Sequence, residues 1–328
     1  MSGMNRIIIG DCRDGMRTLI AQGVRVQCVV TSPPYWGLRD YGVDGQIGLE
    51  RTYPEFIANM VEVFDLVRQL LADDGTLWLN MGDSYAGSWG AQGRQGMTGE
   101  MAQRSIVSAR QIAVAQRRAS GTGSIDRAPG CKPKDLVGIP WRLAFALQDA
   151  GWWLRQDVIW SKPNPMPESV RDRCTKAHEY LFLMAKSERY YYDAEAIKEP
   201  AAYPDGPGNR RQKYSEAYEA GDERMRTKAG LVDIGPRDTR NRRSVWTIAT
   251  QPYPEAHFAT FPEALVEPCV LAGSRPGDIV FDPFMGSGTV AAVAQRLGRK
   301  WLGCELNPAY GELIEQRVRG TLGLELTA

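Results

Sequence analysis

The residues with the clearest chemical potential are an acid and the glycine-rich turn that follows it. In Asp278–Thr289 an apolar run ends at Asp282, and Gly286, Ser287 and Gly288 precede a helical pattern. Glycine lets the backbone approach a ligand closely, and the first N–H groups of a helix bind anionic groups. The Asp282 carboxylate suits an ammonium group. The candidate ligand-binding turn also includes Pro283, Phe284 and Thr289.

A second acid favours one class of ligand. Glu305 follows the next apolar run, where it is placed to accept hydrogen bonds from ribose hydroxyls. The glycine spacing departs from the dinucleotide fingerprint. A ligand with an ammonium group and a ribose therefore fits S-adenosylmethionine better than a nicotinamide dinucleotide. Taken alone, the glycine turn is equally compatible with an ordinary strand–helix connection of an α/β protein.

The second candidate is an apolar strand that ends abruptly in a polar residue, two prolines and two aromatics. It reads Val29–Gly37 and contains Ser32, Pro33, Pro34 and Tyr35. Proline has a fixed φ and no N–H, so the Ser32 hydroxyl and the Pro33 carbonyl are rigid acceptors. The Tyr35 ring offers a face for stacking a planar base. A polyproline-type turn is the alternative, which the preceding buried strand disfavours.

These two segments carry a family resemblance. Thr31–Gly37 and Phe281–Thr289 resemble the signatures of the amino-group DNA methyltransferases, which methylate N4 of cytosine or N6 of adenine with S-adenosylmethionine as cofactor. The catalytic signature comes first, an order similar to the β group, in which a target-recognition region lies between the two. The resemblance implies catalytic roles for Ser32, Pro33, Pro34 and Tyr35.

Two shorter segments extend the resemblance on the cofactor side. Ile8–Cys12 is similar to the strand whose acid, here Asp11, meets the cofactor adenine. His257–Pro262, with Thr260 and Phe261, is similar to the segment that cradles the methionine moiety. Asp11 is equally well explained as the N-cap of the following helix.

Further segments resemble the substrate side of the family. Trp78–Tyr85, which contains Asp83, is similar to a strand and loop that line the target pocket. Lys162 and Asn164 belong to a loop that resembles the one flanking the flipped base, and Trp36 adds an aromatic substrate contact. The alternatives are a solvated surface lysine at Lys162 and a turn closed by Asp83.

The implied reaction depends on positioning more than on acid–base chemistry. The exocyclic amine of a base is a poor nucleophile, because its lone pair is delocalised into the ring. Acceptors at Ser32 and Pro33 would hold both N–H bonds and help to localise that lone pair. The base must also leave the duplex, and Tyr35 is the expected stacking surface.

The expected substrate is cytosine N4. In the family that the chain resembles, Ser before Pro-Pro-Tyr is associated with cytosine N4, and Asp or Asn with adenine N6; Ser32 holds that position here. Adenine N6 is the alternative, because both amines make the same two hydrogen bonds. An RNA or protein amine methyltransferase and a non-catalytic DNA-binding protein are less favoured.

Strands and helices that alternate along the chain must position these residues. Apolar runs bounded by turn residues predict seven buried strands: Arg6–Ile9, Val26–Thr31, Thr76–Asn80, Trp153–Trp160, Tyr180–Ala185, Asp278–Phe281 and Lys300–Cys304. A helical stripe from Phe56 to Leu71 ends at Asp73–Gly75, and further helices are expected at Trp141–Ala150, Phe261–Leu271 and Thr289–Leu297. This alternation predicts an α/β fold with a mainly parallel sheet. The resemblance implies a Rossmann-like, S-adenosylmethionine-dependent methyltransferase fold with a seven-stranded sheet and circularly permuted motifs.

Two polar segments interrupt the alternation and carry positive charge. The whole chain has 40 Lys and Arg against 39 Asp and Glu, but Gly87–Lys134 has eight basic and two acidic residues, and Gly206–Arg243 has ten and six. We therefore predict a catalytic half at 1–192 with a basic insertion at 87–133, a target-recognition region at 193–243, and a cofactor-binding half at 244–328. Double-stranded DNA is the expected partner, with its backbone held by the basic segments.

Composition argues against several other classes of protein. The 328 residues are 43% hydrophobic and 24% charged, as in soluble globular proteins. With no 18-residue apolar run and no signal-peptide pattern, we expect a cytoplasmic protein without membrane contact. Six scattered cysteines and two histidines disfavour a metal site. The sequence leaves open whether the chain is a monomer or a homodimer, and whether a cognate restriction endonuclease exists.

Overall fold

The computed structural model describes residues 4–38, 42–86, 128–202, 210–226, 228–233, 237–251 and 261–321. The chain forms two compact units: Met1–Tyr192 together with Ser244–Ala328, and Asp193–Arg243. The second unit spans the residues that the sequence assigned to a target-recognition region, a role that stays a prediction. Most of the basic insertion predicted at 87–133 lies outside the described residues.

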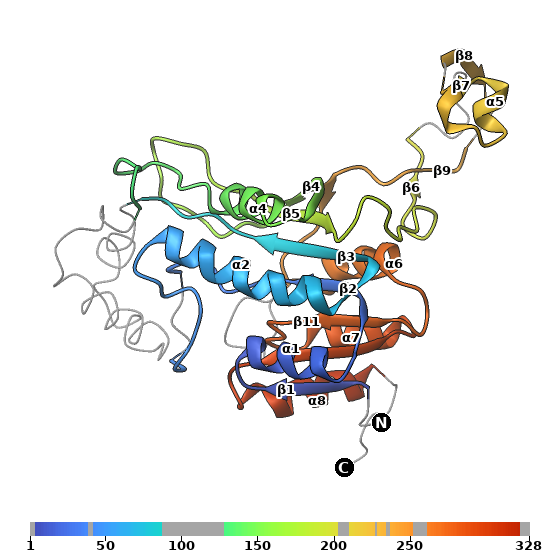
Figure 1. Ribbon diagram of the computed structural model, residues 1–328. Coiled ribbons are helices and arrows are strands. Elements are labelled where there is room, and N and C mark those ends of the chain that lie inside the picture. The colour runs from blue at the N-terminus through green and yellow to red at the C-terminus, as the bar shows by residue number, and fades with distance from the viewer. Residues whose placement is uncertain are drawn as a thin grey trace. The chain divides into compact units, whose positions relative to one another are not determined.

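The first unit is built on a mainly parallel sheet with the strand order β1-β12-β11-β2-β3-β5-β4-β10 (Figure 1). The strands are β1 (Arg6–Ile9), β2 (Val26–Thr31), β3 (Leu71–Met81), β4 (Trp153–Ser161), β5 (His178–Ala185), β10 (Val245–Thr247), β11 (Ile279–Asp282) and β12 (Lys300–Glu305). β5 runs antiparallel to β3 and β4, and the other pairs are parallel. β11 and β2, distant in sequence, are neighbours, with Phe281 opposite Val29.

The predicted α/β fold with a mainly parallel sheet is confirmed, but the described residues form a sheet of eight strands where seven were expected. The additional strand is β10, which pairs in parallel with β4 at the edge of the sheet. It has three residues, too few for an apolar pattern to be recognised in the sequence. Its central Trp246 is buried and packs against Trp78 of β3.

Helices cover both faces of this sheet. α1 (Cys12–Ala21), α2 (Tyr53–Leu70) and α4 (Ile139–Asp149) share one hydrophobic cluster with β2 and β3. α6 (Glu263–Gly273), α7 (Thr289–Arg296) and α8 (Tyr310–Gly320) pack in series on the other face. Val29 belongs to the first cluster, whereas the neighbouring Cys28 thiol contacts the Cys269 carbonyl of α6. Successive strand residues point to opposite faces, so the unit has three layers.

Helix α2 ends earlier than its apolar stripe predicted. Thr52 and Glu55 form a reciprocal capping box at its start. The predicted stop at Asp73–Gly75 is wrong, because α2 ends at Leu70 and Leu71 already has an extended backbone that pairs with Val26 of β2. Gly75 therefore lies inside β3, where a Cβ atom would come within 2.5 Å of the Leu71 side chain.

The second unit consists of short antiparallel pairs. β6 (Glu199–Pro200) pairs with β9 (Thr239–Arg240), and β7 (Arg210–Tyr214) pairs with β8 (Lys228–Asp233). Between β7 and β8 lie α5 (Glu216–Glu219) and the 3₁₀ turn η2 (Glu223–Met225). Glu199 accepts hydrogen bonds from Arg240 and Arg243, which ties the two ends of the unit together.

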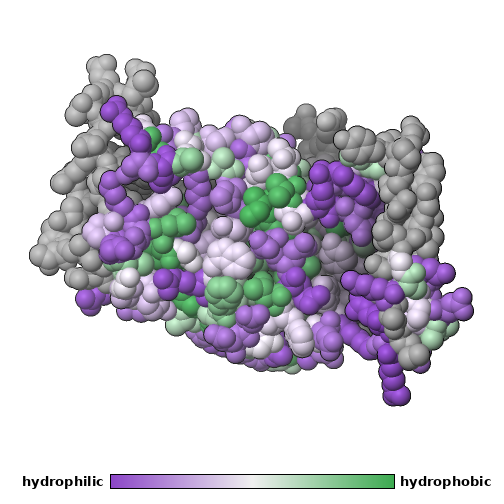
Figure 2. All heavy atoms as spheres, turned by 90° about the horizontal axis from the view of Figure 1, so that it is seen from above, coloured by the Kyte–Doolittle hydropathy of each residue, from purple (hydrophilic) through white to green (hydrophobic). Residues whose placement is uncertain are grey.

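Hydrophilic residues cover much of the described surface in the view from above, with smaller apolar patches between them (Figure 2). None of the helices in the described ranges combines the length and the apolar character that spanning a membrane requires.

Candidate active site

A cavity of about 160 Å³ opens at the carboxyl ends of adjacent parallel strands in the first unit. Its walls come from the residues that follow β1, β2, β11 and β12, together with the loop at 43–47 and the start of α8. The lining residues that the sequence had singled out are Asp11, Ser32, Pro34, Phe261, Pro283, Phe284, Gly286, Ser287, Thr289 and Glu305. Ligands of open α/β sheets bind at this edge.

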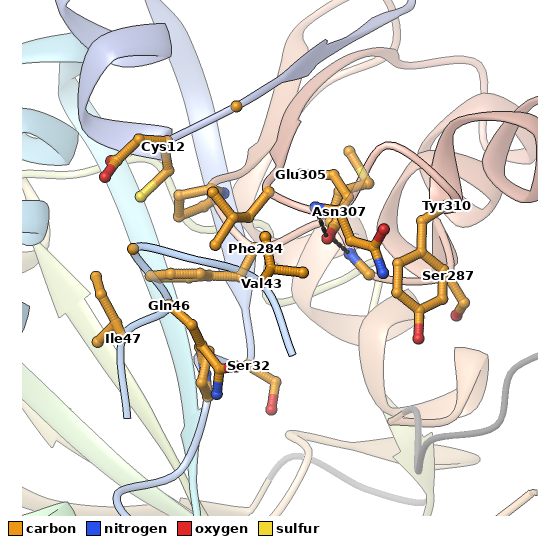
Figure 3. Close-up of a pocket in the computed structure, with 18 of the residues that line it drawn as sticks. Cys12, Ser32, Val43, Gln46, Ile47, Phe284, Ser287, Glu305, Asn307 and Tyr310 are labelled. Atoms are coloured by element: carbon orange, nitrogen blue, oxygen red, sulfur yellow. Dashed lines mark hydrogen bonds between the residues drawn. The ribbon is translucent and has the colours of Figure 1, made fainter. Parts of the chain in front are cut away.

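The two candidate segments face each other across this cavity (Figure 3). Ser32 and Gln46 lie on one side, and Ser287 and Tyr310 lie on the other. Their proximity follows from the pairing of β2 with β11, because each segment directly follows one of these strands. The sequence missed Gln46 and Tyr310, since neither belongs to a glycine or proline motif.

The glycine turn is fixed by backbone conformation and by Glu305. Gly286 and Gly288 have φ values of +53° and +80°, a backbone conformation that residues with a Cβ atom rarely adopt. The Gly286 N–H donates to Glu305 Oε2 at 2.8 Å, and the Asn307 N–H donates to Oε1 at 2.9 Å. Burial raises the pKa of Glu305, which these hydrogen bonds oppose. Glu305 therefore shapes the turn, and each oxygen keeps a lone pair for a ligand.

An arginine that the sequence did not single out anchors the same turn. Arg317 Nη1 donates to Ser287 Oγ at 2.9 Å and to Thr289 Oγ1 at 3.0 Å, and Nη2 donates to Glu263 Oε1 at 2.9 Å. The hydroxyls of Ser287 and Thr289 thus bind α8. Arg317 stands in a helix with no local motif, so only the packing of α8 against α7 reveals its role.

Asp282 directly precedes the cavity-lining residues Pro283 and Phe284 and is fully buried. Its Oδ1 accepts from Thr31 Oγ1 at 2.6 Å and from the Phe284 N–H at 2.9 Å. Its Oδ2 has no hydrogen-bond partner among the described residues. Burial raises the pKa of Asp282 to about 7. An unpartnered buried carboxylate oxygen fits a ligand that brings an ammonium group.

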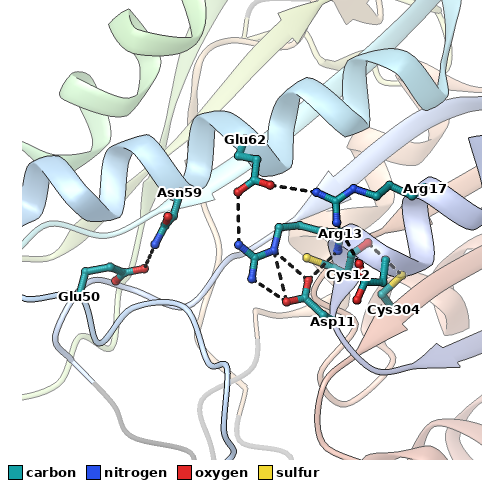
Figure 4. A network of polar contacts seen from close by, with 9 residues as sticks. Asp11, Cys12, Arg13, Arg17, Glu50, Asn59, Glu62 and Cys304 are labelled. Atoms are coloured by element: carbon teal, nitrogen blue, oxygen red, sulfur yellow. Dashed lines mark hydrogen bonds and ion pairs between the residues drawn. The ribbon is translucent and has the colours of Figure 1, made fainter.

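Asp11 caps α1, which confirms the alternative reading of this residue. Its Oδ1 accepts from the Arg13 N–H at 2.8 Å, and its Oδ2 accepts from Arg13 Nη2 at 2.6 Å. Arg13 and Arg17 also contact Glu62 of α2 (Figure 4). Hydrogen bonds from Arg13 lower the pKa of Asp11 and keep it ionised. Asp11 also lines the cavity, and its contact with adenine stays a prediction.

A polar cluster lies next to Ser32. Ser32 Oγ is 3.2 Å from Asn80 Oδ1, and the Tyr35 hydroxyl is 2.7 Å from Glu179 Oε2 and 3.1 Å from Asn80 Oδ1. Glu179 Oε1 forms an ion pair with Lys162. We call Ser32, Tyr35, Asn80, Lys162 and Glu179 the Glu179 cluster. Lys162 is thus a half-buried partner of an acid, not a solvated surface lysine.

The remaining substrate-side residues occupy other places. Trp36 is 1% exposed and donates to the Glu50 carbonyl, so its ring packs in the core and presents no surface to a base. Asp83 accepts from the N–H groups of Gly138 and Ile139 and caps α4, which favours the structural alternative.

The remaining candidate residues that the structure describes do not line the cavity. Asn164 exchanges hydrogen bonds with the backbone of Thr250, beyond β10, and thereby fixes its loop. Pro33 is buried and is not one of the residues that line the cavity, although its neighbours Ser32 and Pro34 are. Gly288 belongs to the glycine turn but does not line the cavity, and Thr260 lies outside the described residues. No group of three His, Cys, Asp or Glu that could hold a metal occurs in the ranges that the structure covers.

A family comparison identifies the molecule. The sequence model of the DNA methylase family matches residues 26–316. The chain belongs to the DNA methylase family. This methylase is 45% identical over 311 residues to the type II methyltransferase M.Cfr9I of Citrobacter freundii, covering 95% of this chain and 86% of the relative. It is 46% identical over 316 residues to M.SmaI of Serratia marcescens, covering 95% and 90%.

Solved structures share the fold of this methylase. One is the PvuII DNA methyltransferase, described as cytosine-N4-specific, with a TM-score of 0.58 at 17% identity over 95% of this chain and 85% of that chain. Another is M1.HpyAVI in complex with S-adenosylmethionine, with a TM-score of 0.52 at 15% identity over 95% and 98%. The methylase is an S-adenosylmethionine-dependent enzyme that methylates amino groups of DNA bases.

Proposed function

We propose that this methylase transfers a methyl group to N4 of a cytosine that has been flipped out of duplex DNA. The observation that carries the proposal is that Ser32 and Pro34 share one cavity with the glycine turn and Glu305. An amine held at the first segment therefore lies next to a cofactor held at the second. Adenine N6 is the alternative substrate.

The proposed cofactor contacts follow from the donors and acceptors around the cavity. Asp282 would take the ammonium group, because its Oδ2 is buried and unpartnered among the described residues. Glu305 would take the ribose hydroxyls, and Asp11, which also lines the cavity, would contact the adenine. Bound S-adenosylmethionine supplies an electrophilic methyl group. The chain itself needs only to hold the cofactor and the amine in line and to exclude water.

The proposed amine contacts are the Ser32 hydroxyl and the Pro33 carbonyl. Two acceptors would bind both N–H bonds, which draws the amine lone pair out of conjugation with the base. The Tyr35 ring packs against Gly82, where a Cβ atom would come within 2.5 Å of the ring. Held in this way, the ring is a rigid surface on which the flipped base would stack. Lys162 and Asn164 belong to the loop that would flank the base.

Support for cytosine over adenine comes from Ser32, the residue before Pro-Pro-Tyr. The test is nucleoside analysis by mass spectrometry of unmethylated plasmid DNA after incubation with enzyme and S-adenosylmethionine. We expect 4-methylcytosine. Detection of N6-methyladenine instead would show that the substrate is adenine. The proposed contacts of Ser32 and Pro33 with the amine would stay the same.

We also propose that the unit Asp193–Arg243 selects the DNA site, since Arg and Gln side chains read base edges in the major groove. The relatives named as type II methyltransferases suggest that this enzyme protects DNA from an endonuclease of the same specificity. Sequencing that maps methylated positions on plasmid DNA tests both points. One short, constant sequence around every methylated base is expected, and methylation scattered without a shared sequence would contradict site selection.

A further inference from the structure

Glu179 is the centre of the Glu179 cluster, although no motif in the sequence indicates it. Oε2 accepts from the Tyr35 hydroxyl at 2.7 Å and from Asn80 Nδ2 at 3.2 Å, and Oε1 pairs with Lys162. Glu179 and Lys162 side chains are 17% and 16% exposed. Glu179 stands on β5, the antiparallel strand between β3 and β4. Glu179 is thus a half-buried acid that contacts three side chains next to the segment Ser32–Tyr35.

The cluster fixes the orientation of the Asn80 amide. Asn80 Nδ2 donates to Glu179 Oε2 and, at 3.1 Å, to the Tyr180 carbonyl. Both partners are acceptors only, so Nδ2 must face them and Oδ1 must face the opposite way. Oδ1 then lies 3.2 Å from Ser32 Oγ.

The orientation of Asn80 in turn decides the direction of the Ser32 proton. The amide oxygen only accepts, so the Ser32 hydroxyl must donate its single hydrogen to Asn80 Oδ1. The Tyr35 hydroxyl does not compete for this role, because its hydrogen has a closer acceptor in Glu179. Ser32 Oγ consequently offers only lone pairs to a group in the cavity.

This direction matters for an amine nucleophile. A hydroxyl that pointed its hydrogen at the amine would bind the lone pair needed for attack, whereas lone pairs on Oγ accept an N–H. We propose that Glu179 and Asn80 are positioning residues that hold the Ser32 hydroxyl in its accepting orientation. The proposal rests on the proposed function of Ser32 as an amine acceptor. Lys162 pairs with Glu179 Oε1, which leaves Oε2 to accept from Tyr35 and Asn80.

The test replaces Glu179 by glutamine, which keeps the shape of the side chain. Lys162 favours the amide oxygen of a glutamine here, which turns the NH₂ group toward Tyr35 and Asn80. The Asn80 amide would then flip, and the Ser32 proton would turn toward the cavity. For Glu179→Gln we expect single-turnover methylation of unmethylated plasmid DNA to slow about tenfold to a hundredfold. KM and Kd for S-adenosylmethionine should stay near the wild-type values.

Glu168→Gln is the matched control. Glu168 is also an ion-paired acid with a 25% exposed side chain, but its partner is Arg173, outside the cluster. We expect the control to retain the wild-type methylation rate and a similar melting temperature. A wild-type rate in Glu179→Gln, or an equal loss in both variants, would overturn the proposal.

Asn80→Leu tests the same chain of contacts independently, should Glu179→Gln fail to fold. Because Glu179 acts through Asn80, the double variant should lose less than the product of the two single losses. Fully multiplicative losses, or a wild-type rate in folded Asn80→Leu, would contradict the proposal. Nucleoside analysis of the wild-type product is a separate readout. A product other than 4-methylcytosine overturns the proposed substrate, whereas the rate comparison alone decides the role of Glu179.

Discussion

Ser32 is the residue on which the proposed chemistry depends most directly. It stands at the end of β2 and lines the cavity, and its hydroxyl contacts Asn80. Ser32→Ala removes one of two amine acceptors, so kcat should fall about a hundredfold, as when one preorganised hydrogen bond is lost from an active site. The Kd for S-adenosylmethionine should change little.

Single-turnover methylation and calorimetric cofactor titration separate these two effects. Ser187→Ala is a suitable control. Ser187 lies just after the end of β5, and its hydroxyl contacts the backbone carbonyls of Asp73 and Arg189, outside the Glu179 cluster. Full methylation activity in Ser32→Ala would remove Ser32 from the mechanism.

Asp282 should make cofactor binding pH-dependent. Burial raises the pKa of this carboxyl from 3.8 to about 7. In the enzyme without cofactor, Asp282 is therefore largely protonated at pH 6, and it must lose that proton to pair with an ammonium group. Affinity should therefore rise with pH and be about tenfold weaker at pH 6 than at its plateau. Titration calorimetry at pH 6 in two buffers of different ionisation enthalpy should detect release of a proton. If no proton is released, Asp282 is not the residue that binds the ammonium group of the cofactor.

The same pKa gives a stability prediction with a definite sign. A carboxyl whose pKa is higher in the folded than in the unfolded state binds its proton more tightly when folded. Its contribution to stability is therefore lost as the pH rises from about 4 to about 7. The neutral variant Asp282→Asn should have a melting temperature without cofactor that equals or exceeds that of the wild type at pH 8. It should also lose the pH dependence of cofactor affinity.

At the scale of elements, α8 supports the cofactor turn from behind. Arg317 joins α8 to Ser287, Thr289 and Glu263 of α6. Arg317→Met should loosen the glycine turn and weaken S-adenosylmethionine binding about tenfold, the loss expected for a charged hydrogen-bond network. Arg319→Met is the control on the same helix, because Arg319 is 62% exposed and pairs with Glu315, also on α8. Equal cofactor affinity in both variants would show that the turn does not depend on α8.

At the scale of the whole molecule, the nearly neutral net charge hides two basic segments. If both hold the DNA backbone, each lost phosphate contact lowers the slope of log affinity against log salt concentration by about 0.9. Replacing Arg224 and Arg237 by glutamine in one segment, or Arg117 and Arg118 in the other, should reduce duplex affinity and flatten this slope. Fluorescence anisotropy over a range of KCl concentrations measures both quantities. Arg319→Gln is the control, and an unchanged slope in both double variants would require another cause for the charge.

The sequence by itself determined the fold class and the two segments that meet at the cavity. Strand patterns, the Pro-Pro turn and the glycine turn are encoded by residues adjacent in the chain, where local backbone preferences dominate. The segments Ser32–Tyr35 and Pro283–Thr289 directly follow two strands that are neighbours in the sheet, β2 and β11. The sequence pattern did not reveal β10 and misplaced the end of α2, because pairing with neighbouring strands decides both.

Only the tertiary structure decided which polar groups touch. Glu179 reaches Tyr35 and Asn80 because β5 inserts antiparallel between β3 and β4, and Arg317 reaches the glycine turn because α8 packs on α7. Trp36 and Asp83, which the sequence placed at the substrate, pack in the core and cap α4 instead. The residue types in the sequence indicate which chemical groups are available. Strand order and register decide which side chains share a site, because those contacts join residues far apart in the chain.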